Sequence, residues 1–269
     1  MDDRSADEWT WRAQLPRSYR LSHVFLLFAG RELKLRYKQT VLGVAWTLLQ
    51  PLAAMAVFAL VFGRLAGLPS DGIPYVPFVY AGLMLWTYLT GTVEAAGRSL
   101  VQDRELLTKS YFPRVLGPAA PIVAGLVDLV LLLPVLGVLV AAFGIQLSPA
   151  LLLAPLCVVA TVVIAFATGL LFAALNVQFR HVKYALPFLL QLWLYASAVV
   201  YPVSLFEGTW RLAYGLNPMV GVLSSFRWSV LGGPLPGVEV AASAVSAAVI
   251  LTLSLGYVAR VERRFADVG

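Results

Sequence analysis

The segment Leu151–Leu175 reads LLLAPLCVVATVVIAFATGLLFAAL and carries no charged side chain over 25 residues. A helix needs about 20 apolar residues to cross the hydrocarbon core of a bilayer. Six stretches meet this requirement, and we predict them as transmembrane helices: Val41–Phe62, Phe78–Gly97, Val115–Phe143, Leu151–Leu175, Tyr184–Val203 and Val238–Ala259. The third contains Pro121 and Pro134, which predict a tilt or a kink.

The composition of the whole chain agrees with this interpretation. Of 269 residues, 60% are hydrophobic and 13% are charged, and the mean hydropathy is +0.81. Soluble domains are about 45–50% apolar and about 25% charged, and disordered chains are poor in apolar residues. These values exclude a water-soluble enzyme and a disordered chain, and they predict an all-α integral membrane protein.

The basic residues predict the orientation. Of the 20 Lys and Arg residues, all except Arg64, Arg211 and Arg227 fall on one side of the six predicted spans. Because basic residues accumulate on the cytoplasmic side, both termini are predicted to be cytoplasmic. The net charge of +6 then reflects membrane orientation, and we predict no nucleic-acid partner.

Two segments outside the spans have distinctive patterns. Within residues 18–40, apolar side chains recur at helical spacing and precede a basic run at 31–38, which predicts an amphipathic helix in contact with lipids at the cytoplasmic interface. Residues 204–237 are apolar for an outer loop and are broken by prolines and glycines. We predict that they form re-entrant helices packed against protein.

The sequence lacks the residues that several classes of enzyme require. No Gly-Lys pair occurs, so the chain has no phosphate-binding loop of the G-x-x-x-x-G-K-[ST] type. Two histidines and one cysteine are too few for a metal cluster. Cys157, inside an apolar run, is expected to be a small core residue. We therefore expect no catalytic residue, no metal and no cofactor on this chain.

Three acids lie within the predicted spans. Glu94 is four residues before Arg98, a spacing that favours a helical ion pair. Glu239 begins the last span, where we expect it to be solvated. Asp128 lies near the middle of the third span, where a charge is expensive. It either contacts a coupling ion or the substrate, or is buried and hydrogen-bonded against a neighbouring helix, and the second reading is favoured.

Aromatic residues are abundant near the ends of the predicted spans. The default interpretation is an interfacial belt. The alternative is a channel lining on which sugar rings stack, with four candidates: Tyr80, Trp86, Tyr88 and Tyr201.

Four groups of motifs, in order along the chain, resemble the polysaccharide ABC-exporter permeases of the ABC-2 type, which export O-antigen, capsule or teichoic acid. They are Arg31–Trp46 with Gln50-Pro51-Leu52; Lys109–Arg114; Asn176–Tyr184 with Gln191 and Tyr201-Pro202; and Asn217-Pro218-Met219 with Phe226-Arg227, followed by Phe265-Ala266-Asp267. The chain departs from the family pattern at Arg180-His181, where Arg-Asp is common. It also departs at Ser197-Ala198-Val199, where Ser-Pro-Val is common, so the local bend is expected to differ.

The resemblance implies a single transmembrane domain over residues 1–269, a homodimeric channel in the bacterial inner membrane, and two copies of a separate ABC ATPase that bind Mg-ATP. The substrate would be a polysaccharide linked to undecaprenyl diphosphate. Residues 102–112 resemble the coupling helix, with four candidate contacts to the ATPase: Asp103, Arg104, Glu105 and Lys109. Basic candidates for the substrate entrance, which would hold the diphosphate by charge, are Arg31, Lys34, Arg36 and Lys38.

Three other functions compete with polymer export. An ABC-2 permease could instead move a drug or a lipid. A secondary transporter would be expected to show inverted repeats with paired polar breaks, which the sequence lacks. An integral membrane enzyme acting on polyprenyl phosphate would need clustered acids or histidines, and Asp103 with Glu105 is too little.

Overall fold

The computed structural model describes residues 25–34, 41–102, 115–179 and 181–266, and every regular element within these ranges is a helix. Five described helices are long and apolar enough to cross a membrane: Ala45–Leu65, Tyr75–Gln102, Leu116–Ala142, Pro149–Gln178 and Val238–Arg260. The prediction of an all-helical membrane protein is thereby confirmed.

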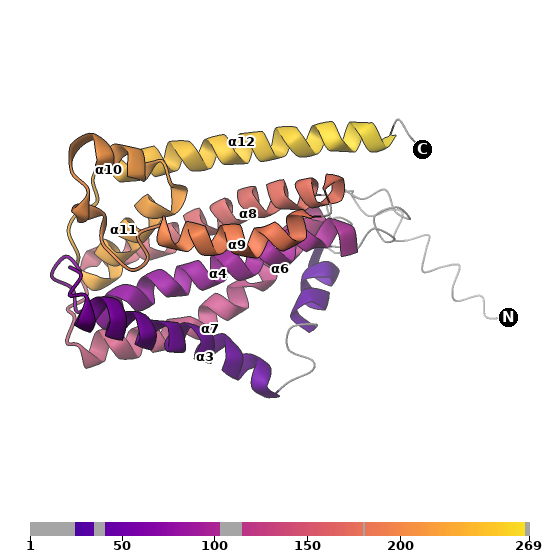
Figure 1. Ribbon diagram of the computed structural model, residues 1–269. Helices are drawn as coiled ribbons and strands as arrows, with labels where there is room; N and C mark the ends of the chain where they lie inside the picture. Colours follow the sequence, from indigo (N-terminus) through magenta and orange to yellow (C-terminus); the bar gives the residue numbers. More distant parts are fainter. Residues whose placement is uncertain (1–24, 35–40, 103–114, 180, 267–269) are drawn as a thin grey trace.

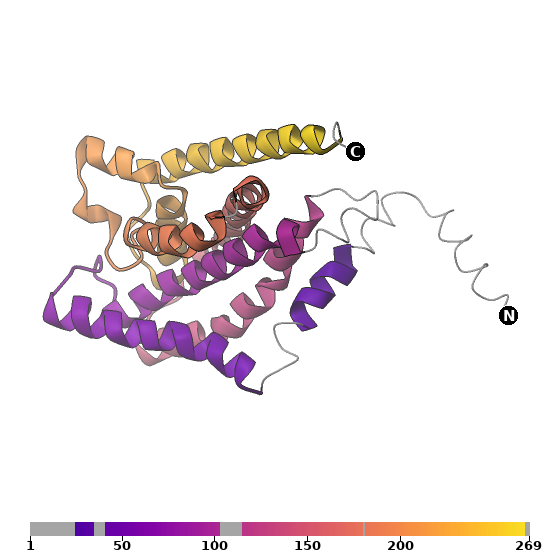
Figure 2. The ribbon, with the colours of Figure 1, turned by 45° about the vertical axis from the view of Figure 1, so that its right-hand side comes forward.

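The long helices lie side by side as a bundle (Figure 1). In chain order they are α3 (Val41–Phe58) with its π-helical continuation η1 (Ala59–Leu65), α4 (Tyr75–Gln102), α6 (Leu116–Ala124), α7 (Leu126–Ala142), α8 (Ala154–Gln178) after the short η2 (Pro149–Leu153), α9 (Val182–Tyr195) and α12 (Val238–Ala266). Two short helices, α10 (Gly208–Gly215) and α11 (Pro218–Leu231), lie at one end of the bundle, which we call the α10–α11 end. Helical residues 25–34 and the last turns of α12 lie at the opposite end, as Figure 2 also shows.

The third predicted span is divided at Gly125, between α6 and α7. Gly125 follows Pro121 by four residues, and its N–H donates to the Pro121 carbonyl over 2.9 Å. A Cβ at Gly125 would lie 2.3 Å from a methyl group of Thr92, so the break sits where this span packs closely against α4. Pro134 lies inside α7 without ending it. Asp128 is half-buried in the first turn of α7, at the helix end that favours negative charge.

The fifth predicted span, Tyr184–Val203, extends past the end of its helix. α9 has 14 residues and ends at Tyr195, which gives a length of about 21 Å at about 1.5 Å per residue. The hydrocarbon core is about 30 Å thick. Five described helices therefore have spanning length, and a sixth crossing that includes α9 stays a prediction.

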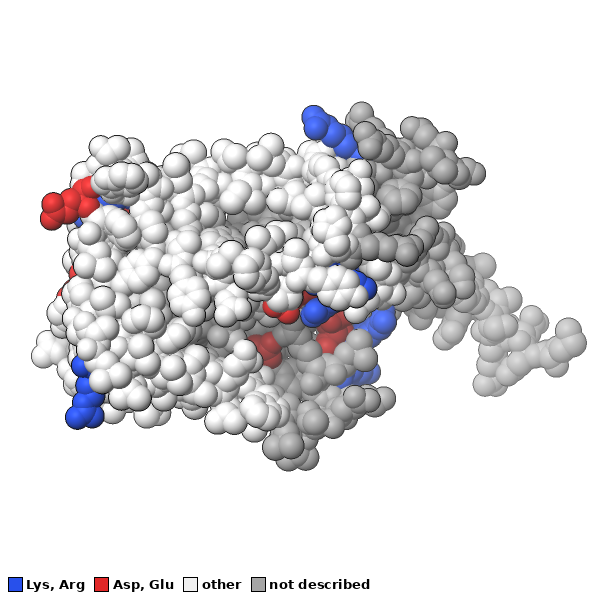
Figure 3. Space-filling model, in the orientation of Figure 1, with Lys and Arg blue, Asp and Glu red and all other residues white. Residues whose placement is uncertain are grey.

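Helix α4 forms the centre of the bundle. It contacts α3, α6, α7, α8, α9 and α11, and its hydroxyl and small side chains meet these neighbours. The Tyr80 hydroxyl donates to the Leu132 carbonyl of α7 over 3.0 Å, and the Tyr88 hydroxyl donates to the Ile122 carbonyl of α6 over 3.0 Å. On the face shown in Figure 3, a broad band free of acids and bases lies between charged groups toward the two ends, as a bilayer would require.

Candidate functional site

The described site begins where α9 ends. Residues 196–202, which we call the unwound joint, leave the helical path after Tyr195. Because exposed carbonyl groups are costly in an apolar surrounding, the joint needs hydrogen-bond donors from elsewhere. Side chains from α4 and α11, and Asn217 at the start of α11, supply them.

Arg227 of α11 is the main donor. Its Nη1 donates to the Ala198 carbonyl over 2.7 Å and its Nη2 to the Val199 carbonyl over 2.6 Å. Its Nε donates to the Phe78 carbonyl of α4 over 3.1 Å, and its guanidinium carbon lies 3.6 Å from the centre of the Phe78 ring. The side chain is 5% exposed. One buried cation therefore joins α4, α11 and the unwound joint.

Tyr75 and Asn217 satisfy two more carbonyls of the joint. The Tyr75 hydroxyl donates to the Val200 carbonyl over 2.7 Å. Asn217 Nδ2 donates to the Ala196 carbonyl over 2.6 Å. The side-chain oxygen of Asn217 accepts from the Met219 N–H over 3.1 Å, which caps α11, and Pro218 follows at the first helical position. The Asn-Pro motif noted in the sequence thus both starts α11 and holds the end of α9.

Ala198 sits in the joint with φ of +54° and is fully buried. This left-handed angle is unusual for a residue with a Cβ and is closed to proline, whose ring fixes φ near −65°. A proline at this position could therefore not adopt the backbone angle found here.

An aromatic cluster covers the joint at the α10–α11 end. The Tyr214 hydroxyl accepts from the Ala198 N–H over 2.9 Å and shares a 2.7 Å hydrogen bond with the Tyr201 hydroxyl. The Phe206 and Tyr214 rings stack with centroids 4.4 Å apart. Burial and the Tyr201 hydrogen bond raise the pKa of Tyr214, so its hydroxyl stays neutral and keeps its proton.

The expectation that Glu239 is solvated was wrong. Its side chain is 1% exposed, and it accepts from Arg211 Nε and Nη2 over 2.9 Å each and from the Gly237 N–H over 2.8 Å. The hydrogen bonds from Arg211 to this carboxylate raise the pKa of Arg211. This bidentate pair fixes α10 to the first turn of α12. The ion pair that the sequence did predict, Glu94 with Arg98, is confirmed at 3.9 Å between partly exposed side chains.

A small polar cavity of about 130 Å³ lies beside these groups at the α10–α11 end. Its lining includes two acids, two bases, two serines and a tryptophan: Asp71, Glu239, Arg211, Arg227, Ser204, Ser224 and Trp228. The cation of each arginine is matched by carboxylate or carbonyl oxygens, so this cavity can hold a polar group without strong preference for either charge. No cluster of metal-binding side chains occurs among the described residues.

The structure places the candidate channel residues in two settings. Tyr80, Trp86 and Tyr88 are at most 3% exposed inside the single chain. The two tyrosines bind backbone carbonyls, as described above, and Trp86 packs edge-to-face on Trp193 with centroids 5.5 Å apart. Tyr201 is half-buried at the unwound joint. A packing role is therefore favoured for the first three, and channel lining stays a prediction.

The basic and coupling candidates are only partly described. Arg31 and Lys34 are exposed on helical residues 25–34, where Phe25 and Phe28 are half-buried and Ala29 is buried. Leu26 and Leu27 are exposed as well, and the role of this helix at the membrane interface stays a prediction. Arg36 and Lys38 lie outside the described residues, as do Asp103, Arg104, Glu105 and Lys109.

Sequence reasoning missed the part played by Arg227 and underestimated Glu239. Arg227 was counted as a cation of the outer side, although it stands in an apolar stretch between Phe226 and Trp228. A lone arginine in such a stretch signals a buried site, because it must find acceptors there. Its acceptors are backbone carbonyls of a broken helix, which no residue pattern identifies.

Comparisons with known proteins agree with this architecture. The model of the ABC-2 type transporter family matches residues 23–231. The O-antigen export system permease protein RfbA of Myxococcus xanthus is 32% identical over 236 residues, which cover 87% of this chain and 90% of that protein.

More distant relatives extend the match. A protein of the same name from Klebsiella pneumoniae is 22% identical over 93% of this chain and 97% of its own length. The inner membrane transport permease YadH of Escherichia coli is 26% identical over 69% of this chain and 76% of its own length. The likeness to the first two covers nearly the whole chain.

Proposed function

Because this chain belongs to the ABC-2 type transporter family, as a multi-pass permease subunit without an ATPase domain, we propose that it forms the channel of an ATP-driven polysaccharide exporter. The exporter would move an O-antigen-like polymer, linked to undecaprenyl diphosphate, across the bacterial cytoplasmic membrane. The observation that carries this proposal is the near-full-length similarity to O-antigen export permeases.

The family implies a partner ATPase, and we propose an assembly of two permease copies with two ATPase chains that bind Mg-ATP. Asp103, Arg104, Glu105 and Lys109 would contact the ATPase through a coupling helix at residues 102–112. Closure of the ATPase pair on ATP would then open a channel between the two permease copies. Both termini would be cytoplasmic, on the side where most Lys and Arg residues fall.

The substrate would enter near the interface helix. Arg31 and Lys34 are exposed there, and with Arg36 and Lys38 they offer cations for the diphosphate. At the opposite end, α10 and α11 with the unwound joint would form re-entrant helices that cap the exit. Satisfaction of the joint's carbonyls by Arg227, Tyr75 and Asn217 supports this, since irregular backbone at membrane depth must be packed inside protein.

Co-purification tests the proposal. The tagged chain is expressed with the products of its neighbouring genes, isolated in nanodiscs, and assayed for a bound ATPase. We expect a one-to-one ratio of permease to ATPase and ATP hydrolysis that changes with added lipid-linked polysaccharide. Joint reversal of Asp103 and Glu105 to Arg should remove the ATPase, whereas the control Arg64→Glu, in η1, should retain it. A permease that purifies alone contradicts the assembly.

The competing function is export of a drug or a lipid by the same kind of assembly. The chain is also similar to YadH, whose name says that it is a transport permease but names no polysaccharide. This similarity supports the alternative. An ATPase that co-purifies but responds to a drug or a free lipid, and not to the lipid-linked polymer, would favour it.

A further inference from the structure

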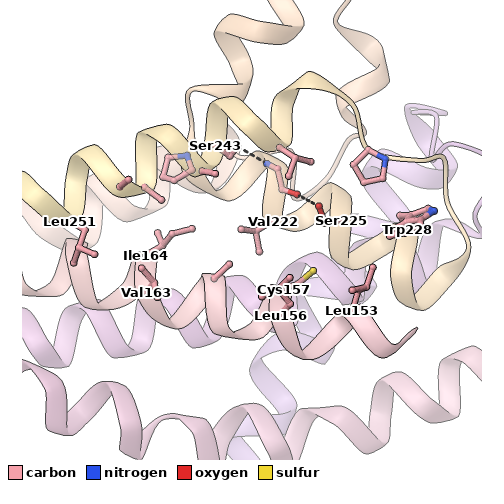
Figure 4. Close-up of a pocket in the computed structure, with 18 residues that line it drawn as sticks. Leu153, Leu156, Cys157, Val163, Ile164, Val222, Ser225, Trp228, Ser243 and Leu251 are labelled. Atoms are coloured by element: carbon pink, nitrogen blue, oxygen red, sulfur yellow. Dashed lines mark hydrogen bonds between the residues drawn. The ribbon is translucent and has the colours of Figure 1, made fainter. Parts of the chain in front are cut away.

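A groove on the side of the bundle is separate from the site described above. It has a volume of about 650 Å³ and lies between α8, α11 and α12 (Figure 4). Leu156 and Ile164 of α8, Val222 of α11 and Leu251 of α12 line it, and Cys157 contributes its sulfur. We call it the lateral groove. Its volume is within the range of about 300–1,000 Å³ that is usual for small-molecule sites.

The lateral groove offers a ligand almost no hydrogen bonds. Its lining contains no charged residue, and its two hydroxyl groups are used by the protein. The Ser225 hydroxyl donates to the Gly221 carbonyl over 2.7 Å, and the Ser243 hydroxyl accepts from the Gly221 N–H over 2.8 Å and donates to the Gly215 carbonyl over 2.8 Å. A sugar or a peptide would leave its own polar groups unpaired here, at a free-energy cost. The lining therefore suits a hydrocarbon chain.

The length of the groove matches one leaflet of a bilayer. From Leu153, at the end of η2, it extends along α8 to Ile164, which corresponds to about 16 Å at about 1.5 Å per residue. Half of the hydrocarbon core is about 15 Å. The groove lies in the half of the bundle that includes α11, toward the α10–α11 end. A chain that occupies it would belong to a lipid of the leaflet at that end.

The groove adjoins the polar cavity at the same end. Trp228 and Pro236 line both spaces. The indole N–H of Trp228 has no hydrogen-bond partner among the residues that the structure describes, and tryptophan prefers the level of lipid headgroups. Arg211, also in the polar cavity, has a side chain that is 35% exposed. Glu239 engages only Nε and Nη2 of Arg211, so Nη1 of Arg211 and the indole N–H of Trp228 can donate hydrogen bonds to a phosphate oxygen at the polar end of a hydrocarbon site.

We propose that the lateral groove binds one acyl chain of a membrane phospholipid, whose headgroup phosphate lies at the polar cavity beside Trp228 and Arg211. The bound lipid fills the space between α8 and α12, and it anchors the α10–α11 end of the bundle in the leaflet to which the lipid belongs. The proposal requires a membrane and this fold, and it does not depend on what the protein exports.

Native mass spectrometry of the detergent-purified protein tests the proposal. The wild-type chain should retain one phospholipid per copy. Ala244 and Ala248 are exposed residues of α12 that line the groove, so A244W and A248W fill it from the open side. Each should lower the lipid-bound fraction tenfold or more. The matched control A241W changes an exposed alanine of α12 outside the groove lining and should keep the lipid.

A second variant tests the headgroup. W228F keeps an aromatic ring but removes the indole N–H, so it should lower retention of a phospholipid severalfold while leaving retention of diacylglycerol, which has no phosphate, unchanged. Full lipid retention in both A244W and A248W overturns the proposal. It is also overturned if these variants convert an oligomer to single chains without loss of lipid, because a second copy would then occupy the groove.

Discussion

Helices α3 and α4 are consecutive in the chain, and their roles are the reverse of what hydropathy would suggest. In the span Ala45–Leu65, formed by α3 and η1, the best 18-residue window has a mean hydropathy of 1.9 and 6% of its residues are buried. In the corresponding window of α4 the mean hydropathy is 1.2 and 78% of the residues are buried. Lipid tails are as apolar as leucine, so apolar surface gains little by leaving them for protein. Small side chains and hydrogen bonds decide which helix is central. Hydropathy thus finds the spans but ranks their burial in the wrong order.

Removal of Arg227, the cation that binds α4, should lower the stability of the protein more than any other change considered below. Arg227→Met leaves the carbonyls of Ala198 and Val199 without a donor in a buried site, and removes a second donor from the Phe78 carbonyl inside α4. At about 1–3 kcal/mol for each buried acceptor left unsatisfied, the variant should lose at least about 2 kcal/mol of stability. Thermal unfolding can be followed with a thiol-reactive dye, since Cys157 is buried and is the only cysteine.

The control for Arg227→Met is Arg64→Met. Arg64 is an exposed arginine of η1, on the less buried span, and its loss should change stability by no more than about 0.5 kcal/mol. Equal losses of stability in the two variants would show that Arg227 does not hold α4, α11 and the unwound joint together.

One substitution at two positions of α4 separates its packed face from its open face. A Cβ at Gly82 would lie 2.6 Å from Arg227 Nη2 and 3.0 Å from the Val199 carbonyl, whereas a Cβ at Gly91 meets nothing within 4 Å. Alanine favours a helix over glycine by about 1 kcal/mol, but overpacking costs about 1–3 kcal/mol. In the same unfolding assay Gly82→Ala should lower stability by about 1–2 kcal/mol, and Gly91→Ala should leave it equal or higher. A stabilising Gly82→Ala would contradict the close approach of α4 to the joint.

The sequence was sufficient for the class of the protein and for the position of most spans, because a long run without charge has few structural solutions in water or lipid. It also predicted the Glu94–Arg98 pair from helical spacing. The end of α9 was not predictable from apolar content, since residues 196–200 are as apolar as the helix before them. The chain can leave the helical path there because Asn217, Arg227 and Tyr75, which are distant in sequence, bind the carbonyls of the residues that follow the helix.

The candidate site was less predictable than the fold. Tyr80 and Tyr88 lie at the helical period expected of a shared face, but sequence does not say whether that face meets a channel or another helix. In the structure it meets α6 and α7. Glu239 was misjudged because its partner, Arg211, is 28 residues away, on a short helix within the segment for which the sequence predicted re-entrant helices but no ion pair.

The two ion pairs offer a third test. Glu239→Gln removes the charge from a bidentate contact of a side chain that is 1% exposed, and hydrogen bonds to charged groups contribute about 1.5–3 kcal/mol. Because Arg211 keeps one acceptor and some solvent, we expect a loss of about 1–2 kcal/mol. Glu94→Gln on α4 alters a 3.9 Å contact between partly exposed groups, for which about 0.5 kcal/mol or less is expected. The assay is again dye-monitored unfolding. A larger loss of stability in Glu94→Gln than in Glu239→Gln would contradict our conclusion that Arg211–Glu239 is the more stabilising pair.

The smallest effect is expected on the exposed face of α3, at Leu49, which is 51% exposed. Leu49→Ala exchanges contacts with lipid for slightly different contacts with lipid, so the stability of the single chain should change by less than about 0.5 kcal/mol. A loss above about 1 kcal/mol in monomeric chains would mean that α3 is packed, and the contrast with α4 would fail. Sedimentation in detergent adds a second reading, because the proposed homodimer must cover some apolar face of each copy. If Leu49→Ala weakens association while unfolding of the single chain is unchanged, α3 is covered by the second copy in the dimer, which explains its low burial in the single chain. If association is also unchanged, α3 faces lipid, and its high hydropathy is explained by that contact alone.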